Sequence, residues 1–162
     1  GVLSRFDPSE RHISGHAPTK EMALHSAFYE TRTSTGAVVH LHSAHAIALS
    51  LLDNSDPDNF LPPLTPYAIM KLSKMTLLRF FLPGDPAMGA AVCGLAGKRS
   101  AVMLAHHGPV VAGRNVEAAC NAIEELENTA RLALLTQDMA RRELTDTQVR
   151  DIVTKLDVEW ES

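Results

Sequence analysis

The sequence has few of the features that mark a secreted, a membrane-spanning or a nucleic-acid-binding protein. Its two cysteines, Cys93 and Cys120, form no Cys-x-x-Cys motif and are too few for a disulfide framework. No apolar run approaches the roughly 18 residues of a membrane-spanning helix. The residues from Gly1 onward do not resemble a signal peptide. We therefore expect a protein of the cytoplasm with no membrane partner.

Clusters of basic residues are also scarce. The chain has 15 Lys and Arg against 19 Asp and Glu, a formal net charge of −4, and its basic pairs are Lys98-Arg99 and Arg141-Arg142. Because nucleic-acid binding depends on Lys and Arg gathered against phosphates, we expect no nucleic-acid partner. The 162 residues, of which 45% are hydrophobic and 21% charged, suit one globular domain with a single core.

Apolar spacing and chain breakers predict helices that alternate with strands. We expect helices over residues 19–31, 44–52, 86–98, 116–141 and 146–156, and strands over 37–42, 75–81, 100–105 and 110–112. Residues 1–15 are predicted to be a turn-rich lead-in, and 53–66 a loop rich in Asp, Asn and Pro. Asn115 is expected to cap the longest helix. The alternation predicts the α/β class.

Two histidines at the end of an apolar run are the most informative feature that is present. In His40-Leu41-His42, residues i and i+2 of a strand point to the same side, so two imidazoles are presented together. A second apolar run, 102–105, ends in His106-His107. One ligand from that pair would complete the three-ligand, open pattern of a catalytic zinc site. The alternative is that these histidines are incidental or hydrogen-bonded core groups.

Several separate blocks of the sequence, in the same order, resemble the class II aldolase/adducin family. The blocks are Ala17-Pro18-Thr19-Lys20-Glu21, then His40-Leu41-His42, then 107–113, then Glu124-Glu125-Leu126-Glu127. Within the family, the sequence at residues 40–43, 61–67 and 83–85 is most similar to that of the 3-oxo-tetronate 4-phosphate decarboxylase branch. The resemblance runs from about Leu3 to the C-terminal helix.

The resemblance implies a fold as well as a site. It implies a three-layer α/β domain over residues 1–162, with a central, mostly antiparallel sheet flanked by helices. Family members usually carry about 45 to 50 further residues at the position before Gly1. We therefore expect the N-terminal portion of the family fold, with part of its phosphate site, to be missing from this sequence. The resemblance also implies a homotetramer with active sites between subunits.

The resemblance assigns the metal ligands and their metal. His40, His42 and His107 would be the three ligands, with His106 a neighbour outside the ligand set. Zinc is the expected ion, and Mn²⁺ and Co²⁺ are alternatives because imidazole ligands accept all three.

The resemblance also assigns residues to the substrate. Glu21 occupies the position of the catalytic acid/base at the start of a helix. From the residues alone, it could equally be an ordinary first-turn carboxylate favoured by the helix dipole. Thr19 and Lys20 fall where the family binds the substrate phosphate, which suits the free N–H groups of a helix N-terminus.

Tyr67 is our candidate for a second catalytic acid. The prolines of the 62–66 loop before it reduce the conformational entropy lost when the tyrosine is held in place. The alternative is a packed aromatic ring with its hydroxyl in water.

These assignments imply a metal-dependent carbon–carbon lyase that acts on a small phosphorylated sugar acid. The expected reaction decarboxylates 3-oxo-tetronate 4-phosphate to dihydroxyacetone phosphate and CO₂ through a zinc-stabilised enediolate. A class II sugar-phosphate aldolase is an alternative, since a retro-aldol cleavage passes through the same type of intermediate. A non-catalytic, adducin-like binding domain is another. A zinc hydrolase is less attractive, because the sequence has no His-Glu-x-x-His motif.

Overall fold

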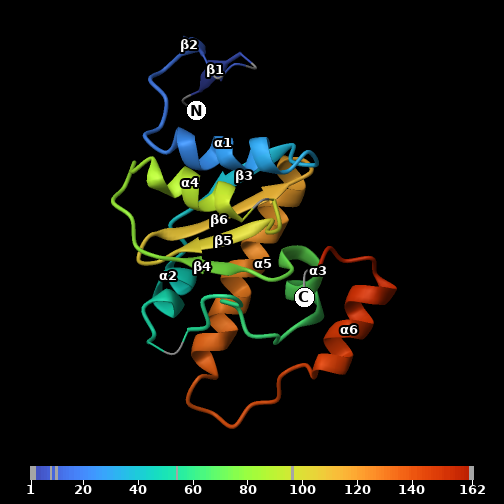
Figure 1. The fold of residues 1–162 in the computed structure, drawn as a ribbon. Helices are drawn as coiled ribbons and strands as arrows, with labels where there is room; N and C mark the ends of the chain where they lie inside the picture. Colours follow the sequence, from blue (N-terminus) through green and yellow to red (C-terminus); the bar gives the residue numbers. More distant parts are fainter. Residues whose placement is uncertain (1–2, 8, 10, 54, 96, 161–162) are drawn as a thin grey trace.

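A computed structural model describes residues 3–7, 9, 11–53, 55–95 and 97–160. The elements follow in the order β1 (Ser4–Phe6), β2 (His12–Gly15), α1 (Met22–Thr31), β3 (Ala37–His40), α2 (Ala44–Ser50), α3 (Pro66–Leu72), β4 (Thr76–Leu78), α4 (Ala87–Gly94), β5 (Ala101–Leu104), β6 (Gly108–Gly113), α5 (Val116–Leu135) and α6 (Asp146–Lys155). Helices and strands interleave along the chain (Figure 1), so the predicted α/β class is confirmed.

The central sheet has four strands in the order β3–β6–β5–β4. β6 is antiparallel both to β3, where His40 lies opposite Val110, and to β5, where Leu104 lies opposite Gly108. β4 is parallel to β5. The expected, mostly antiparallel sheet is thus confirmed. The register also sets the end of β3 beside the turn between β5 and β6.

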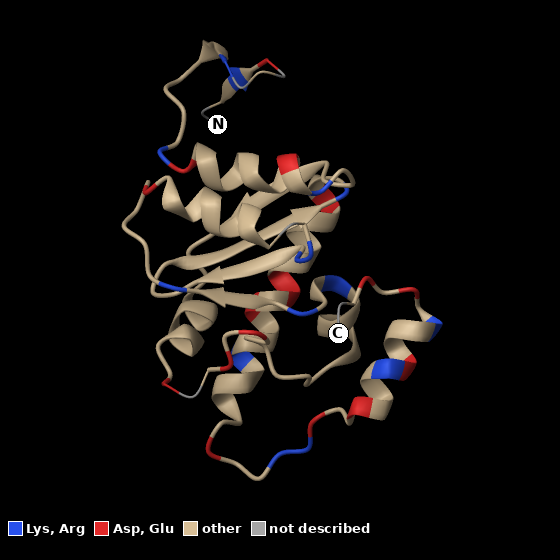
Figure 2. Cartoon of the chain, in the orientation of Figure 1, with Lys and Arg blue, Asp and Glu red and all other residues tan. Residues whose placement is uncertain are grey.

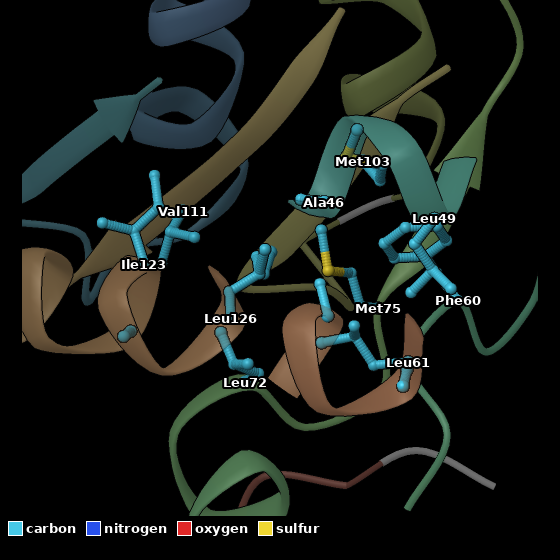
Figure 3. Close-up of a cluster of buried hydrophobic side chains, with 14 residues drawn as sticks. Ala46, Leu49, Phe60, Leu61, Leu72, Met75, Met103, Val111, Ile123 and Leu126 are labelled. Carbon is cyan, nitrogen blue, oxygen red and sulfur yellow. The ribbon is translucent and has the colours of Figure 1, made fainter. Parts of the chain in front are cut away.

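The alternation of side chains along the strands creates two apolar layers, one on each face of the sheet. On β5, Met103 points to the layer formed with α2, α3 and α5, whereas Leu104 points to the layer formed with α1 and α4. Figure 3 shows the first of these layers, where Leu126 of α5 and Leu72 of α3 lie close to Met75. Each large apolar side chain buried in this way stabilises the fold by about 1.5–3 kcal/mol.

Charged residues lie outside this core. The four strands of the central sheet contain no Lys, Arg, Asp or Glu, whereas α6 carries both signs of charge along its length (Figure 2). Within the part of the chain that the structure describes, none of the helices combines the length and apolarity required to cross a membrane.

The longest helix begins as predicted and ends earlier. The Asn115 side chain accepts a hydrogen bond from the Ala118 N–H, which is the expected cap of α5. The helix stops at Leu135, not at 141, because the chain turns back and the Arg141 guanidinium donates to the Ala133 carbonyl. This side chain satisfies a carbonyl that a continuing helix would otherwise have bonded.

Three elements were not predicted: the strands β1 and β2 and the helix α3. Residues 1–15 were expected to be a lead-in without strands, but β1 and β2 form a two-stranded antiparallel ribbon that projects beyond α1 in Figure 1. Residues 66–72 form the short helix α3, capped by Thr65, whose hydroxyl accepts from the Ala68 N–H. The Thr-Pro pair at 65–66 is a helix-start signal, because proline suits the first helical position.

Candidate metal centre

Three imidazoles converge at one end of the central sheet. His40 is the last residue of β3, His42 lies in the connection to α2, and His107 lies in the turn between β5 and β6. The strand register brings these segments together, and one ring nitrogen from each histidine lies within 4.8 Å of the others. The ring centroids are 4.9–5.5 Å apart. The structure therefore brings together the three histidines that were predicted as ligands.

The ring nitrogens of His40 and His107 differ in their hydrogen-bond partners. His40 Nδ1 lies 2.9 Å from the Pro109 carbonyl oxygen. Because a carbonyl can only accept, Nδ1 carries a proton, so in the neutral ring Nε2 is the nitrogen with the free lone pair. His40 Nε2 and His107 Nδ1 are buried and have no hydrogen-bond partner among the described residues. An unpaired buried polar atom costs about 1–3 kcal/mol, so the unpaired Nε2 of His40, which faces the Glu21 carboxylate, fits a metal ligand.

The Glu21 carboxylate faces the same cluster. Glu21 Oε1 lies 3.1 Å from His107 Nε2, and Oε2 lies 3.3 Å from His40 Nε2. The contact with His40 is close but makes no hydrogen bond. Glu21 is the N-cap residue of α1, yet its side chain caps no helix N–H. Its carboxylate is therefore directed to the histidines and not to the end of its own helix.

Burial favours the neutral form of His107, the form that binds a metal ion. Burial lowers the pKa of His107 below its ordinary value; the Glu21 carboxylate raises it, and the His40 and His42 rings lower it further. His25, one turn into α1, was not assigned a role from the sequence. Burial lowers the pKa of His25, and the charges of His40 and Glu21 then act on it in opposite directions.

Thr19 and Lys20 lie immediately before Glu21 and are exposed. The Thr19 hydroxyl accepts a weak hydrogen bond, 3.4 Å long, from the Glu21 N–H. The Lys20 side chain passes over Gly84, where a Cβ would lie 3.1 Å from Lys20 Cβ. Both residues therefore lie at the beginning of α1, next in the chain to Glu21.

Tyr67 is not brought to the cluster. It lies on α3, which packs against α5 and α6, and 61% of its surface is exposed. No contact among the described residues joins it to the three histidines. Within a single chain, Tyr67 stands apart from the other predicted catalytic residue, Glu21.

A carboxylate that sequence reasoning did not assign supports the segment after His42. Glu127 of α5 accepts hydrogen bonds from the backbone N–H of His45 and of Ala46, both 3.0 Å, and from His45 Nδ1 at 2.8 Å. Burial alone would raise the pKa of Glu127, but these hydrogen bonds outweigh it and hold the pKa below its ordinary value. The only sequence signal was its place in the Glu124–Glu127 block, and no spacing rule identifies a partner so far along the chain.

Comparison with known proteins relates the chain to one family. The model of the class II aldolase and adducin N-terminal domain matches residues 2–134. The chain is 40% identical to the 3-oxo-tetronate 4-phosphate decarboxylase of Haemophilus influenzae over 150 residues, which are 93% of this chain and 71% of that protein. It is 30% identical to the L-fuculose phosphate aldolase of Methanococcus maripaludis over 143 residues, covering 86% of this chain and 76% of that protein.

Solved structures agree with the sequence comparison. The crystal structure of YgbL from Klebsiella pneumoniae superposes with a TM-score of 0.89 at 39% identity. The match covers 93% of this chain and 73% of that one. The two folds are therefore alike over nearly the whole of this chain.

Proposed function

The chain belongs to the class II aldolase and adducin family, and from that membership we propose that it is a carbon–carbon lyase acting on a small phosphorylated sugar acid. The reaction that we propose decarboxylates 3-oxo-tetronate 4-phosphate to dihydroxyacetone phosphate and CO₂. The identity to decarboxylases of that substrate, 40% over most of the chain, supports this choice. The observation that carries the proposal of a lyase is the convergence of three imidazoles and one carboxylate at the end of the sheet. We assign this function to residues 1–162 as a single domain.

We propose that His40, His42 and His107 hold a divalent cation, zinc first and Mn²⁺ or Co²⁺ as alternatives. The grouping of their ring nitrogens and the unpaired, buried Nε2 of His40 support this assignment. When bound, the cation would supply positive charge that stabilises the negative charge developing on the substrate oxygens as the carbon–carbon bond breaks.

Glu21 has the role of proton donor in this proposal. Loss of CO₂ leaves the electron pair of the broken bond on the substrate, as an enediolate. Protonation of its carbon by Glu21 then yields dihydroxyacetone phosphate. The position of the carboxylate against His40 and His107 supports this role, because a general acid must reach the reacting atoms directly. Thr19 and Lys20 would bind the phosphate through the lysine charge and the exposed N–H groups at the start of α1.

We further propose a homotetramer whose active sites lie between subunits. Tyr67 is exposed and away from the histidines of its own chain, so it can act as a second acid only in the site of another copy. A cytoplasmic location is also part of the proposal. The two free cysteines, Cys93 and Cys120, support it because structural disulfides are typical of oxidising compartments.

The test combines metal analysis with product analysis. The purified protein should retain about one divalent metal ion per chain, as a three-ligand site requires, and should release CO₂ and dihydroxyacetone phosphate from 3-oxo-tetronate 4-phosphate. Glu21→Gln should keep the metal and lower kcat by about 100-fold or more. Metal-free protein that no divalent cation activates would contradict the proposal and favour an adducin-like binding role.

A sugar-phosphate aldolase is the second candidate. The 30% identity to an L-fuculose phosphate aldolase favours it, and the same site suits either cleavage. The same assay separates the two, because an aldolase would release an aldehyde together with dihydroxyacetone phosphate from a sugar phosphate, without CO₂.

A further inference from the structure

Helix α2 begins without a cap from its own N-cap residue. Ser43 precedes the helix, but its side chain accepts no hydrogen bond from the first turn. The Glu127 carboxylate takes that place: Oε1 accepts from the His45 N–H and Oε2 from the Ala46 N–H. A residue of α5 thus satisfies donors that a capping side chain normally satisfies.

The position of α2 matters because this helix contacts both segments that carry the clustered histidines. It starts at Ala44, two residues after His42. At its other end, the buried Ser50 hydroxyl donates to the Ile47 carbonyl and accepts from the His106 N–H at 3.2 Å. α2 therefore connects the His42 segment to the turn that presents His107.

The turn needs such support because of its backbone conformation. His106 has a φ of +61°, a left-handed conformation that residues with a Cβ rarely adopt. The His106 N–H donates a hydrogen bond to the Ser50 hydroxyl, and His106 directly precedes His107. A displaced α2 would release both the turn and the segment that carries His42.

We propose that Glu127 is a positioning residue for the histidine cluster: by holding the N-terminus of α2 against α5, it fixes His42 and, through Ser50, His107. This inference rests on the metal site of the proposed function. It gives a purpose to the last acid of the Glu124–Glu127 block, which the proposed reaction does not use.

Cobalt binding tests this inference without reference to turnover. Wild type and Glu127→Gln are stripped of metal and titrated with Co²⁺ against a competing chelator, and the visible spectrum of bound Co²⁺ reports the geometry of its ligands. Glutamine places an amide NH₂ where one carboxylate oxygen accepted, so it cannot accept from both backbone N–H groups. We expect Co²⁺ affinity to fall by about 10- to 100-fold, with an altered spectrum, as for other residues that orient metal ligands.

Glu124→Gln is the matched control. It removes the same charge from the same helix, and no hydrogen bond or ion pair joins Glu124 to another residue in the described ranges, so Co²⁺ affinity should stay within about twofold of wild type. Equal affinity and spectrum for Glu127→Gln and wild type would overturn the inference and leave the metal site standing. A wild type that binds no Co²⁺ would instead overturn the proposed function.

If Glu127→Gln does not fold, the same titration is made with Ser50→Ala. It removes the bond to the His106 N–H at the other end of α2 and leaves the Glu127 carboxylate in place. We expect Co²⁺ affinity to fall by about tenfold. Unchanged affinity in Ser50→Ala would show that α2 does not position the turn and would overturn the inference.

Discussion

At the residue scale, the adjacent histidines His106 and His107 are placed for different tasks. The His107 ring joins His40 and His42, whereas the His106 ring meets Phe80 edge-on, with centroids 6.1 Å apart. The left-handed backbone of His106 separates the two directions. Of these two adjacent histidines, His107 thus belongs to the cluster and His106 packs against Phe80.

His107→Ala should therefore abolish metal retention, while His106→Ala should not. Removal of one of three ligands leaves a site that cannot complete the coordination of the ion. The measurement is metal content per chain after dialysis against a weak chelator, with folding checked by circular dichroism. Metal lost from His106→Ala but kept by His107→Ala would reverse the ligand assignment.

The sequence largely predicted which histidines form the cluster, but it did not predict the residues that hold the neighbouring segments in place. The spacing of His40 and His42 at the end of an apolar run indicates paired imidazoles, but the strand expected over 37–42 ends at His40, so His42 joins the cluster from the connection to α2. The end of the second apolar run predicts a histidine from 106–107 near them. The Glu127 carboxylate lies 82 residues from His45 in the sequence, and only the packing of α2 on α5 brings them together. Local patterns carry no information on such a pair.

At the element scale, β6 begins in close contact with the segment between two of the histidines. A Cβ added to Gly108 would lie 2.2 Å from the Leu41 carbonyl oxygen, a separation that forces the backbone to move. The first residue of β6 therefore has to be glycine if the turn and the His40–His42 segment are to meet.

Gly108→Ala should destabilise the fold by about 1–3 kcal/mol, the usual cost of overpacking, and should weaken metal binding. Gly94→Ala is the matched control. Its added Cβ meets nothing within 4 Å at the end of α4, so stability should hold or rise by up to about 1 kcal/mol. Urea unfolding with and without metal measures both effects, and equal midpoints for the two variants would refute the close-contact argument.

The docking of α2 on α5 should also depend on pH. The folded-state pKa of Glu127 lies below its ordinary value of 4.5, so the unfolded chain binds the proton more readily. The stabilisation is complete above about pH 4.5 and is lost as the pH falls through the folded-state pKa. In the presence of a chelator, wild type should lose stability more steeply than Glu127→Gln as the pH falls below about 4.5. Parallel pH profiles from chemical unfolding would contradict this linkage.

The prediction of elements succeeded where caps and periodicity agree, and failed where tertiary contacts decide. α6 was expected over 146–156 and is found at Asp146–Lys155, where Thr145 and Gln148 form a capping box. α5 was predicted six residues too long, because the contact of Arg141 with the helix end is not a local signal. The β1–β2 ribbon was missed because strands of 3 and 4 residues are too short to show a reliable alternation of apolar and polar side chains.

At the scale of the whole molecule, the predicted acids of the site lie on different faces of one chain. Glu21 begins α1 on one side of the sheet, and Tyr67 lies on α3 on the other (Figure 1). Because Tyr67 does not contact the three histidines of its own chain, it can act in catalysis only at the site of a second copy. The proposed tetramer with shared sites would bring the two acids together, and the resemblance of the sequence to its family predicts such an assembly.

Mixed oligomers test the shared site. Glu21→Gln and Tyr67→Phe chains, each expected to be nearly inactive alone, are co-expressed with different tags and isolated as hybrids. A site with Glu21 from one chain and Tyr67 from its neighbour is intact in about one quarter of random pairings, so about one quarter of wild-type activity should return. If both acids acted within one chain, no pairing would restore a complete site, and hybrids would stay as inactive as their parents. Full activity of Tyr67→Phe alone would remove the tyrosine from the mechanism.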